Sequence, residues 1–563
     1  MPSESLMDTE KLLRKRVGEI PLLLHMAKRL NFEQVLESYL PSHGNEKVRA
    51  SHTLLLLIFN LTSGRQPLYE LSEWVSQIDA RLLGENGPLC TSLFNDDRFG
   101  RALDKLYELD RASLMTDLVL NVVGALDLDL SQIHNDSTSI KTYGQMPSKA
   151  RSGLQFARGH SKDHRPDLKQ IVFSLSLSAD GAVPIHCKSY PGNTTDDTTH
   201  IETWKQLRQI AGRADFLYVA DCKVCTAKQL SFITKHGGRI VTLMPDTWRE
   251  AEAFKQQLRR GNVHKRRILR QLVPGQDDTF ESFYCFNGQH VTEKCGYTLY
   301  WIYTTEKRKR DRLAREQRLE RFERDMAELT GKLNSHVLKT ADQIQERIDK
   351  LVKKHRVNDL YHLQIRTVNE SARVQIGKGR LGKDTRYKMS VRKIYTLAWS
   401  RNKSAMDEQM RTDGIFPILC TDKRIGAKKA LLAYKYQPRL EKRFEQLKSV
   451  HNAAPTLCKK TERVEAMMFL FFMALILQAA IEREVRQSMK HGDIDSIPVY
   501  PEHRLAEHPT TAKIFDRFHD LSLYQLTDGG RLIKEYQDEL SSTHKKVLAL
   551  MGMNEQQYWA KTC

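Results

Sequence analysis

Two aspartates stand where the sequence suggests a metal-binding site. Asp136 lies in the segment IHNDSTS and Asp221 in LYVADCK, and each comes just after a short apolar run of a predicted sheet. Hard divalent cations prefer oxygen ligands, and Mg²⁺ is usually held by one or two carboxylates together with substrate phosphates. A pair of such ions stabilises both the attacking and the leaving oxygen of a phosphoryl transfer. The two carboxylates therefore indicate metal-dependent chemistry on a phosphate ester.

Each aspartate also has a simpler interpretation. An Asp at the end of a strand is commonly a cap or a turn residue. Asp127 and Asp129, in LDLDLSQI, are alternatives to Asp136 as the metal ligand. The pair of aspartates alone therefore does not define a site.

A third carboxylate, on a predicted helix, strengthens the metal interpretation. In YKYQPRLEKRFEQLK, the residues Tyr434, Glu441 and Lys448 follow one another at steps of seven. Seven residues make two helical turns, so the three side chains face the same side. A carboxylate flanked by a phenol and an ammonium group suits a metal ligand whose neighbours hold a DNA backbone.

The carboxylates need a sheet to position them, and the hydrophobic pattern predicts one. Residues 171–177 alternate apolar and serine side chains, which is the period-two pattern of a strand. Asp180 and Gly181 form a hairpin turn before a second strand, residues 182–188. Helices and strands then alternate, as helix 199–211, strand 216–220, helix 226–236 and strand 239–244. Two antiparallel strands followed by this alternation predict a mixed α/β sheet.

The pattern divides the chain into five segments. They are a helical N-terminal domain (1–125), the first part of an α/β core (126–245), an insertion with strands and long helices (246–412), the second part of the core (413–490) and a C-terminal helical tail (491–563). Helical spacing begins at Lys11, and the N-terminal domain either binds DNA or serves only in packing. Within the insertion, the apolar residues from Phe322 onward define one face of a long helix or a helical hairpin. A further helix is expected over residues 426–450.

The chain carries a large excess of positive charge. Its 89 Lys and Arg residues against 69 Asp and Glu residues leave a net charge of +20 over 563 residues. Lys and Arg contacts with phosphates release counterions and give affinity without sequence preference. Nucleic acid is therefore the leading partner, and an anionic membrane surface is the second. A composition with 40% hydrophobic and 28% charged residues excludes disordered and fibrous proteins.

One segment raises the question of a membrane span. Residues 466–481 are apolar, but they contain Gln478 and fall short of the about 20 residues that cross a bilayer. A buried core helix is expected there, and no membrane partner. The N-terminus lacks the features of a signal peptide, and nine cysteines show no disulfide spacing. We therefore expect a cytoplasmic protein with free thiols.

Together these motifs resemble those of the DDE transposases of bacterial insertion sequences, in the insertion-sequence-four-like branch with the helical signature Y-x2-R-x3-E-x6-K. The resemblance covers most of residues 125–490 and rests on HNDSTS, SKDHRPDLKQ, PGNTTD, YVADCK and LEKRFEQLK. It implies a ribonuclease-H-like catalytic core with a large insertion. It also implies that Asp136, Asp221 and Glu441 bind two Mg²⁺ or Mn²⁺ ions, and that Tyr434 and Lys448 contact the DNA end.

One position departs from this signature. Its arginine is expected three residues after Tyr434, where this chain has Gln437. Arg439 and Arg443 are nearby substitutes, and we predict that both bind DNA. Tyr436 and Arg439 have the right mutual spacing, but that register would place Arg443 where the signature has its glutamate.

The resemblance implies a DNA transposase that binds the terminal inverted repeats of its element, cleaves there and joins the 3′ hydroxyls to target DNA. Its partner would be double-stranded DNA, and synapsis of two ends would require a homodimer. In a bacterial cell the protein would associate with the nucleoid when bound to DNA. Two alternatives stay open: a DNA-binding protein derived from a transposase that lacks catalysis, and a nuclease on the same core that cleaves without strand transfer.

Three other patterns favour structural interpretations. The segment Gly377–Gly382 matches G-x-G-x-x-G, but a strand-like segment follows it, so a phosphate-contacting turn is favoured over a dinucleotide site. Cys222 and Cys225 form a C-x-x-C without a second pair of zinc ligands. His134 and His186 are expected to pack or hydrogen-bond within the core.

Overall fold

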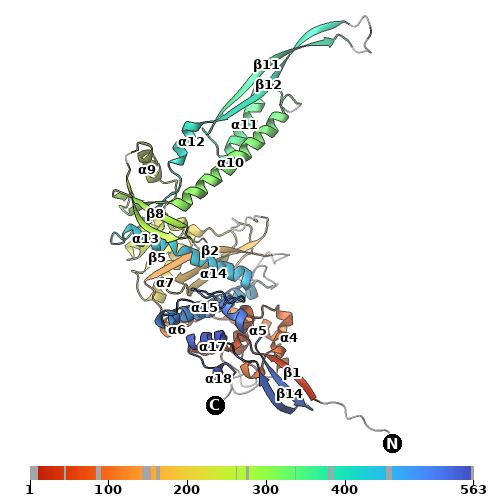
Figure 1. Cartoon of the computed structure of the whole chain (residues 1–563), viewed down its shortest axis with the longest axis vertical. Helices are drawn as coiled ribbons and strands as arrows, with labels where there is room; N and C mark the ends of the chain where they lie inside the picture. Colours follow the sequence, from red (N-terminus) through yellow and green to blue (C-terminus); the bar gives the residue numbers. More distant parts are fainter. Residues whose placement is uncertain are drawn as a thin grey trace. The chain divides into compact units, whose positions relative to one another are not determined.

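The chain divides into two units, and all of the predicted site residues belong to the first. Unit 1 joins residues 1–242 with residues 430–563, and unit 2 holds residues 243–429 (Figure 1). This computed structural model describes residues 10–42, 46–83, 91–142, 154–159, 165, 167–261, 263–273, 278–335, 338–377, 382, 386–451, 460–529 and 531–559. The division into the five segments expected from the sequence stays a prediction.

Unit 1 contributes strands in the order β4-β3-β2-β5-β6 to a mixed sheet. Their bounds are β2 (Gln132–Lys141), β3 (Gln170–Ser178), β4 (Pro184–Pro191), β5 (Leu217–Ala220) and β6 (Arg239–Leu243). Strands β4, β3 and β2 are antiparallel neighbours, whereas β2, β5 and β6 are parallel. The crossover helices are α7 (His200–Ala211) and α8 (Ala227–Lys235). The predicted mixed α/β class is thereby confirmed.

A long apolar helix, α15 (Thr461–His491), forms the centre of the helical part of unit 1. It packs against α3, α5 and β4. By length and composition α15 could span a membrane, but 89% of its most apolar window is buried inside the protein. The apolar segment 466–481 thus belongs to a buried core helix, as its length predicts.

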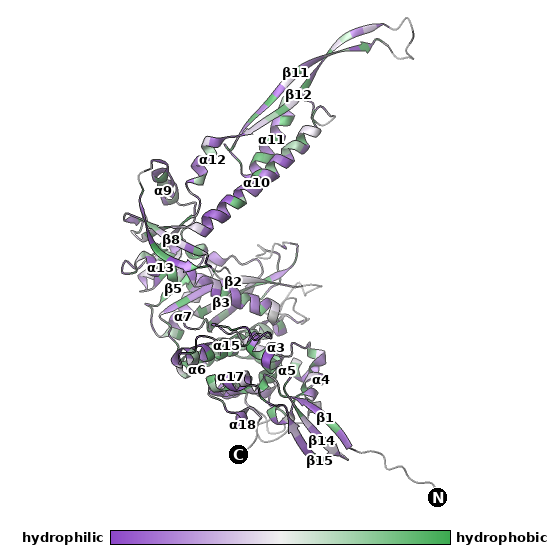
Figure 2. Cartoon of the chain, in the orientation of Figure 1, coloured by the Kyte–Doolittle hydropathy of each residue, from purple (hydrophilic) through white to green (hydrophobic). Residues whose placement is uncertain are grey.

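The N-terminal helices around α15 are mostly short. They are α1 (Ile20–Arg29), α2 (Phe32–Tyr39), α3 (Ala50–Thr62), α4 (Leu71–Gln77), α5 (Asp96–Glu108) and α6 (Arg111–Leu126). Every residue of α3 is buried, which is typical of a helix surrounded by other elements. Figure 2 shows the hydropathy of these elements along the ribbon.

The expectation of helix from Lys11 onward is wrong for residues 11–16, whereas α1 to α6 confirm it for much of the rest of the segment. Residues 10–16 form strand β1 (Glu10–Arg16), which pairs with β14 (Ser522–Asp528) in a sheet completed by β15 (Arg531–Gln537). The C-terminal segment, expected to be helical, therefore contributes two strands beside α16 (Thr511–Phe518), α17 (Ser542–Leu550) and α18 (Glu555–Tyr558). Pairing between the two ends of the chain overrides the local helical pattern, because strand formation depends strongly on its neighbours.

The helix expected over residues 426–450 is interrupted. It consists of α13 (Ala427–Lys435), α14 (Gln437–Glu445) and a π-helical turn over Gln446–Val450. Pro438 occupies the first turn of α14, where its missing N–H does no harm, whereas a proline inside a continuous helix would remove a hydrogen bond. The break therefore falls just before Pro438.

Unit 2 has an antiparallel sheet, a helical hairpin and a long two-stranded ribbon. The sheet orders β13 (Ile415–Cys420), β10 (Thr298–Thr304), β8 (Phe280–Phe286) and β7 (Lys265–Leu272), and β9 (His290–Val291) pairs with β10. Helices α10 (Thr305–Gly331) and α11 (Ala341–His355) form a helical hairpin, and not the single long helix that was the alternative. The ribbon is β11 (Tyr361–Gln375) with β12 (Tyr387–Arg401), and the remaining helices are α9 (Arg249–Arg259) and α12 (Lys403–Met410).

Candidate metal centre

Asp136 lies within β2 and not after a strand as expected. Its strand pairs with β3 on one side and with the parallel strand β5 on the other. The carboxylate Oδ1 accepts a hydrogen bond of 2.7 Å from the backbone N–H of Ser137. Because Asn135 is the register partner of Ala220, the last residue of β5, the chain leaves β5 beside Asp136.

Asp221 is the first residue after β5. Its Oδ1 accepts a 3.0 Å hydrogen bond from the backbone N–H of Lys223, which makes Asp221 the N-cap of a short 3₁₀ turn. Its carbonyl oxygen accepts a 2.6 Å hydrogen bond from the Thr242 hydroxyl on β6. Nε2 of buried His200 lies 4.0 Å from Asp221 Oδ1. These contacts fix both the backbone and the side chain at the carboxyl end of the parallel strand.

A third aspartate, Asp196, joins them from the loop after β4. It begins a 3₁₀ turn, Asp196–Thr198, and its Oδ1 accepts a hydrogen bond from the hydroxyl of Ser137. The sequence contained a signal for this residue, because PGNTTD is among the motifs of the resemblance, but no role was assigned to Asp196. Only the fold reveals that this loop turns back toward β2.

The three aspartates form one cluster. One carboxylate oxygen from each of Asp136, Asp196 and Asp221 lies within 4.8 Å of the others, and all three side chains are half-buried. Like charges at this separation repel one another unless a proton or a cation reduces the charge. Three converging hard oxygen donors fit a divalent cation such as Mg²⁺ or Mn²⁺. These residues could therefore bind a metal ion.

Glu441 is not a member of this cluster. It is exposed on α14, and Asp196 takes the third position among the described residues that could ligate one ion. The seven-residue spacing of Tyr434, Glu441 and Lys448 assumed one continuous helix, but Tyr434 lies on α13 and Lys448 in the π-helical turn. The assignment of Glu441 as a metal ligand stays a prediction.

Tyr434 relates Glu441 to the aspartates by electrostatics. The pKa of its hydroxyl is raised well above the ordinary value, first by burial and then by the negative charges of Asp221, Asp136 and Glu441. The phenol therefore lies within electrostatic reach of both the cluster and Glu441. It keeps its proton at neutral pH and can donate a hydrogen bond to an anion.

Gln437, the departure from the signature, is a structural residue. It is only 6% exposed, and its Nε2 donates a 3.1 Å hydrogen bond to the carbonyl oxygen of Asn135 on β2. Its Oε1 lies 3.1 Å from Nδ1 of His134. Asn135 in turn donates hydrogen bonds to Ser174, Leu175 and Ser176 on β3. Gln437 thus fixes α14 to the strand that carries Asp136.

The two arginines predicted to bind DNA have different surroundings. Arg439 is exposed. Arg443 is only 5% exposed, donates a 3.1 Å hydrogen bond to the carbonyl oxygen of Ala182, and forms a 3.0 Å ion pair with Glu482 on α15. Burial alone would raise the pKa of Glu482, but Arg443 and Arg486 hold it below the ordinary value. This geometry gives Arg443 a structural role, and DNA binding by Arg439 stays a prediction.

Lys448, the last residue of the predicted signature, is half-buried in the π-helical turn. A π-helical turn has more residues per turn than an α-helix. The direction of its side chain therefore does not follow from counting α-helical steps. Its predicted contact with DNA stays a prediction.

Comparisons with known proteins give one family match, to the N-terminal part of the chain, and a weak structural similarity. Residues 13–120 match a family described as a domain of unknown function, DUF4277. No curated protein matches the chain. A cryo-EM structure of the piggyBac transposase synaptic complex with hairpin DNA is similar at 8% identity and a TM-score of 0.34, over 84% of this chain and 78% of that chain. A TM-score of this size does not show a shared fold, and the insertion-sequence-four-like branch stays a prediction.

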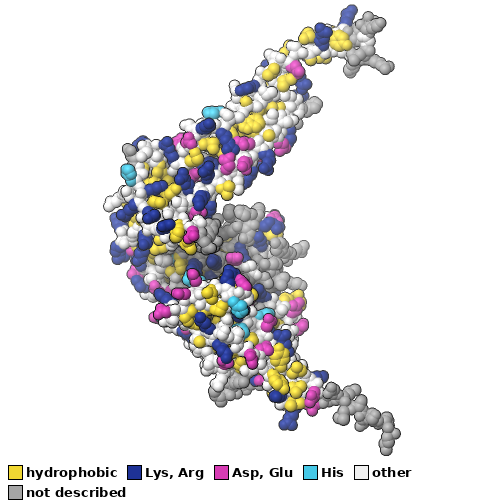
Figure 3. Space-filling model, in the orientation of Figure 1, with side chains coloured by type: hydrophobic (Ala, Val, Ile, Leu, Met, Phe, Trp, Pro, Cys, Tyr) yellow, Lys and Arg dark blue, Asp and Glu magenta, His cyan; other side chains and the backbone are white. Residues whose placement is uncertain are grey.

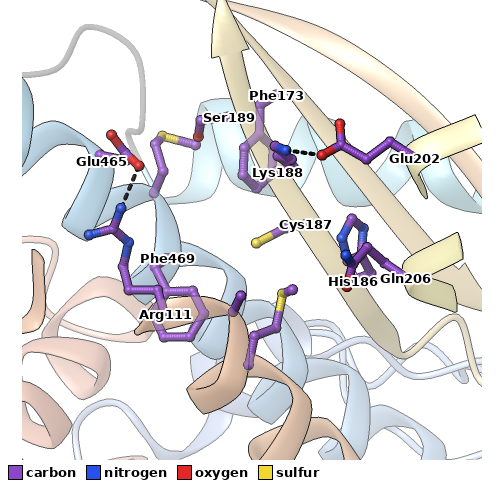
Figure 4. A pocket seen from close by; sticks show the side chains of 13 residues that line it. Arg111, Phe173, His186, Cys187, Lys188, Ser189, Glu202, Gln206, Glu465 and Phe469 are labelled. Atoms are coloured by element: carbon purple, nitrogen blue, oxygen red, sulfur yellow. Dashed lines mark hydrogen bonds and ion pairs between the residues drawn. The ribbon is translucent and has the colours of Figure 1, made fainter. Parts of the chain in front are cut away.

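A pocket in unit 1 is separate from the aspartate cluster. It lies between β4 and the helices α6, α7 and α15, and none of the three aspartates lines it (Figure 4). Its charged groups are paired, since Arg111 and Glu465 lie 2.5 Å apart and Lys188 pairs with Glu202. Burial lowers the pKa of His186 in its wall to about 4. The pocket therefore offers a ligand no unpaired charge among these groups.

The remaining motifs of the sequence are a buried histidine, a cysteine pair and a glycine-rich segment. His134 is buried and contacts Gln437, Gln132 and the ring of Tyr436. Neither Cys222 nor Cys225 belongs to a cluster of possible metal ligands within the described ranges. Most of the glycine motif, residues 377–382, lies outside the described residues.

Proposed function

We propose that this protein is a metal-dependent DNA transposase that binds the ends of its element, cleaves there and transfers the 3′ ends to target DNA. The observation that carries the proposal is the convergence of three carboxylates, from Asp136 within β2, Asp196 in the loop after β4 and Asp221 just after β5. Two of the three were expected from the sequence for this chemistry. The mixed sheet of unit 1 would be the ribonuclease-H-like core that the motifs imply.

The carboxylates would hold one or two Mg²⁺ or Mn²⁺ ions. When bound, such ions lower the pKa of water and stabilise charge on the oxygens of a phosphate ester. Ser137 would hold Asp196 in its orientation through the hydroxyl hydrogen bond, in the way that outer-shell partners orient metal ligands. The negative charge of Glu441, like those of Asp136 and Asp221, raises the pKa of Tyr434. Glu441 would be a further carboxylate beside the bound DNA.

The neighbouring residues would position the DNA. Tyr434 stays protonated and can donate to a phosphate oxygen, and Arg439 presents an exposed guanidinium on the next helix. Positioning of the scissile phosphate supplies much of the rate in enzymes of this kind. Joining two DNA ends would require a homodimer, and we expect the protein to act in the bacterial cytoplasm on the nucleoid.

The test is a cleavage and joining assay. The purified protein is incubated with duplexes that cover the DNA on each side of its reading frame, together with Mg²⁺ or Mn²⁺. We expect metal-dependent nicks at the element ends and joined products, both abolished by Asp136→Asn or Asp221→Asn. The control Glu507→Gln removes an exposed carboxylate of the same unit and should leave both products unchanged.

Other outcomes would contradict the proposal. Cleavage without joining would favour the nuclease alternative, and duplex binding without any metal-dependent cleavage would favour the DNA-binding alternative. Parallel assays of Asp196→Asn and Glu441→Gln decide which of the two acids is the third carboxylate, because loss of products in only one of them identifies it.

A further inference from the structure

The ribbon of β11 and β12 is long, regular and joined to no third strand among the described residues. Its antiparallel register runs without a break from the pair Tyr361 and Arg401 to the pair Gln375 and Tyr387. An isolated two-stranded ribbon is at best marginally stable in water. Its length therefore calls for support at the base.

That support comes from the helical hairpin of unit 2. The apolar side chains of the base pack on the buried cluster of α10 and α11, and they are Leu363, Ile365, Tyr395, Leu397 and Trp399. Arg401 pairs with Glu323 at 2.7 Å and with Glu316 at 2.6 Å. Asn334 binds both backbone groups of Tyr395, at 3.0 and 2.8 Å. The base of the ribbon is thus firmly fixed to the hairpin.

The distal half, residues 368–375 and 386–394, lacks this apolar cover, although Arg392 donates a 3.1 Å hydrogen bond back to the carbonyl oxygen of Asn334. It extends beyond the helical hairpin of unit 2 (Figure 1). Apolar side chains stand exposed there, with Val391 and Met389 each 62% exposed and Val368 55% exposed. A soluble protein rarely displays apolar residues together on a projecting element unless they contact a partner.

The same half carries an excess of positive charge. Five cations are exposed along it, namely Arg373, Arg386, Lys388, Arg392 and Lys393, and the acidic residue within these ranges is Glu370. Figure 3 shows Lys and Arg side chains beside hydrophobic ones along this element. Two such ribbons would repel each other, so the charge favours a polyanionic partner over a second copy of the chain.

We propose that the distal half of the β11–β12 ribbon inserts into a groove of duplex DNA. The major groove, about 12 Å wide, admits a two-stranded ribbon, whose strands lie only about 4.8 Å apart. Eight residues of strand reach about 26 Å, so the cations can contact phosphates on both sides of the groove. Val391 and Met389 would then meet base edges, where apolar side chains contact the methyl group of thymine.

This inference rests on the proposed function for the identity of its partner and adds the element that grips the duplex. The test measures binding of a fluorescein-labelled random-sequence duplex in EDTA, so that metal and cleavage play no part. The ribbon variant combines Arg373→Gln, Lys388→Gln and Lys393→Gln. The control combines Arg347→Gln, Lys339→Gln and Lys353→Gln, which remove the same charges from exposed positions elsewhere in unit 2.

We expect the ribbon variant to bind the duplex at least tenfold more weakly, with a salt dependence reduced by about one unit of slope for each cation lost. The control should change affinity by much less. Circular dichroism and the thermal midpoint check that both variants fold.

Equal affinities of the ribbon variant and the control would overturn the inference and leave the proposed function standing, whereas absence of duplex binding by the parent protein would contradict both. Sedimentation of the DNA-free protein tests the alternative that the ribbon binds a second copy of the chain. A dimer of the parent protein that the ribbon variant loses would assign the ribbon to a second copy and overturn the DNA inference.

Discussion

At the scale of single residues, the candidate site depends on which side chains the fold turns toward one another. Asp136 and Asp221 could be predicted because each lies in or just after a segment with the pattern of a strand, and these two strands, β2 and β5, are neighbours. Asp196 could not, because a loop residue is brought to the site only by the path of the chain after β4. Spacing also could not separate Arg439 from Arg443, which are one helical turn apart and differ completely in burial.

The two arginines give a residue-scale prediction. Arg443→Ala should lower the free energy of unfolding by about 1–3 kcal/mol, because it removes one of the two cations beside buried Glu482 and leaves Arg486, at 3.4 Å, as its ion-pair partner. Arg439→Ala should leave stability within about 0.5 kcal/mol of the parent and weaken duplex binding. Urea unfolding and fluorescence anisotropy measure the two effects. A stable Arg443→Ala variant with weak DNA binding would restore Arg443 as a DNA contact.

At the scale of elements, the sheet and its crossover helices were predictable because buried strands leave a clear alternation. The sheet of β1, β14 and β15 was not, since its strands come from opposite ends of the chain. The break before α14 had a visible cause in Pro438, but the pattern of Tyr434, Glu441 and Lys448 favoured one helix. What the sequence could not indicate was how α14 is fixed to β2, which depends on buried Gln437.

Gln437→Ala tests this attachment. The change removes the hydrogen bond to the Asn135 carbonyl and the contact with Nδ1 of His134, and an unsatisfied buried group costs about 1–3 kcal/mol. We expect that loss of stability in urea unfolding, together with a loss of cleavage activity as α14 shifts. Lys442→Ala, at an exposed position of the same helix, is the matched control. Equal stability of the two variants would refute the anchoring role.

Three buried histidines of unit 1 should make the stability of the fold depend on pH. Burial lowers the pKa of His134, His186 and His451 from 6.5 to about 4. Between these values the unfolded chain binds protons that the folded chain does not, so stability falls as the pH falls from about 6.5 to about 4. Each histidine contributes up to about 1.4 kcal/mol per pH unit.

Urea midpoints at pH 7.5 and pH 5 measure this effect. We expect a clearly lower midpoint at pH 5 and a smaller difference in His134→Asn. Midpoints that do not change with pH would contradict the burial of these rings.

At the scale of the whole molecule, the structure shows where part of the positive charge behind the net charge of +20 lies. Exposed cations lie on the distal ribbon and along β7 of unit 2, and Arg439 lies in unit 1 near Glu441. We therefore expect steep salt dependence of duplex binding. If six to ten phosphates are contacted, affinity should fall on the order of 10³–10⁵-fold between about 50 and 200 mM salt. Titrations at several salt concentrations check this, and a flat response would exclude DNA as the purpose of the charge.

The central claim is that Asp136, Asp196 and Asp221 together bind a divalent cation. Titration of the DNA-free protein with Mn²⁺, followed by electron paramagnetic resonance, tests it most directly. We predict binding by the parent protein and by the Glu507→Gln control. Each of Asp136→Asn, Asp196→Asn and Asp221→Asn should weaken it by at least about 10- to 100-fold, the loss typical even of an outer-shell partner. Equal Mn²⁺ affinity in all of these proteins would contradict the account.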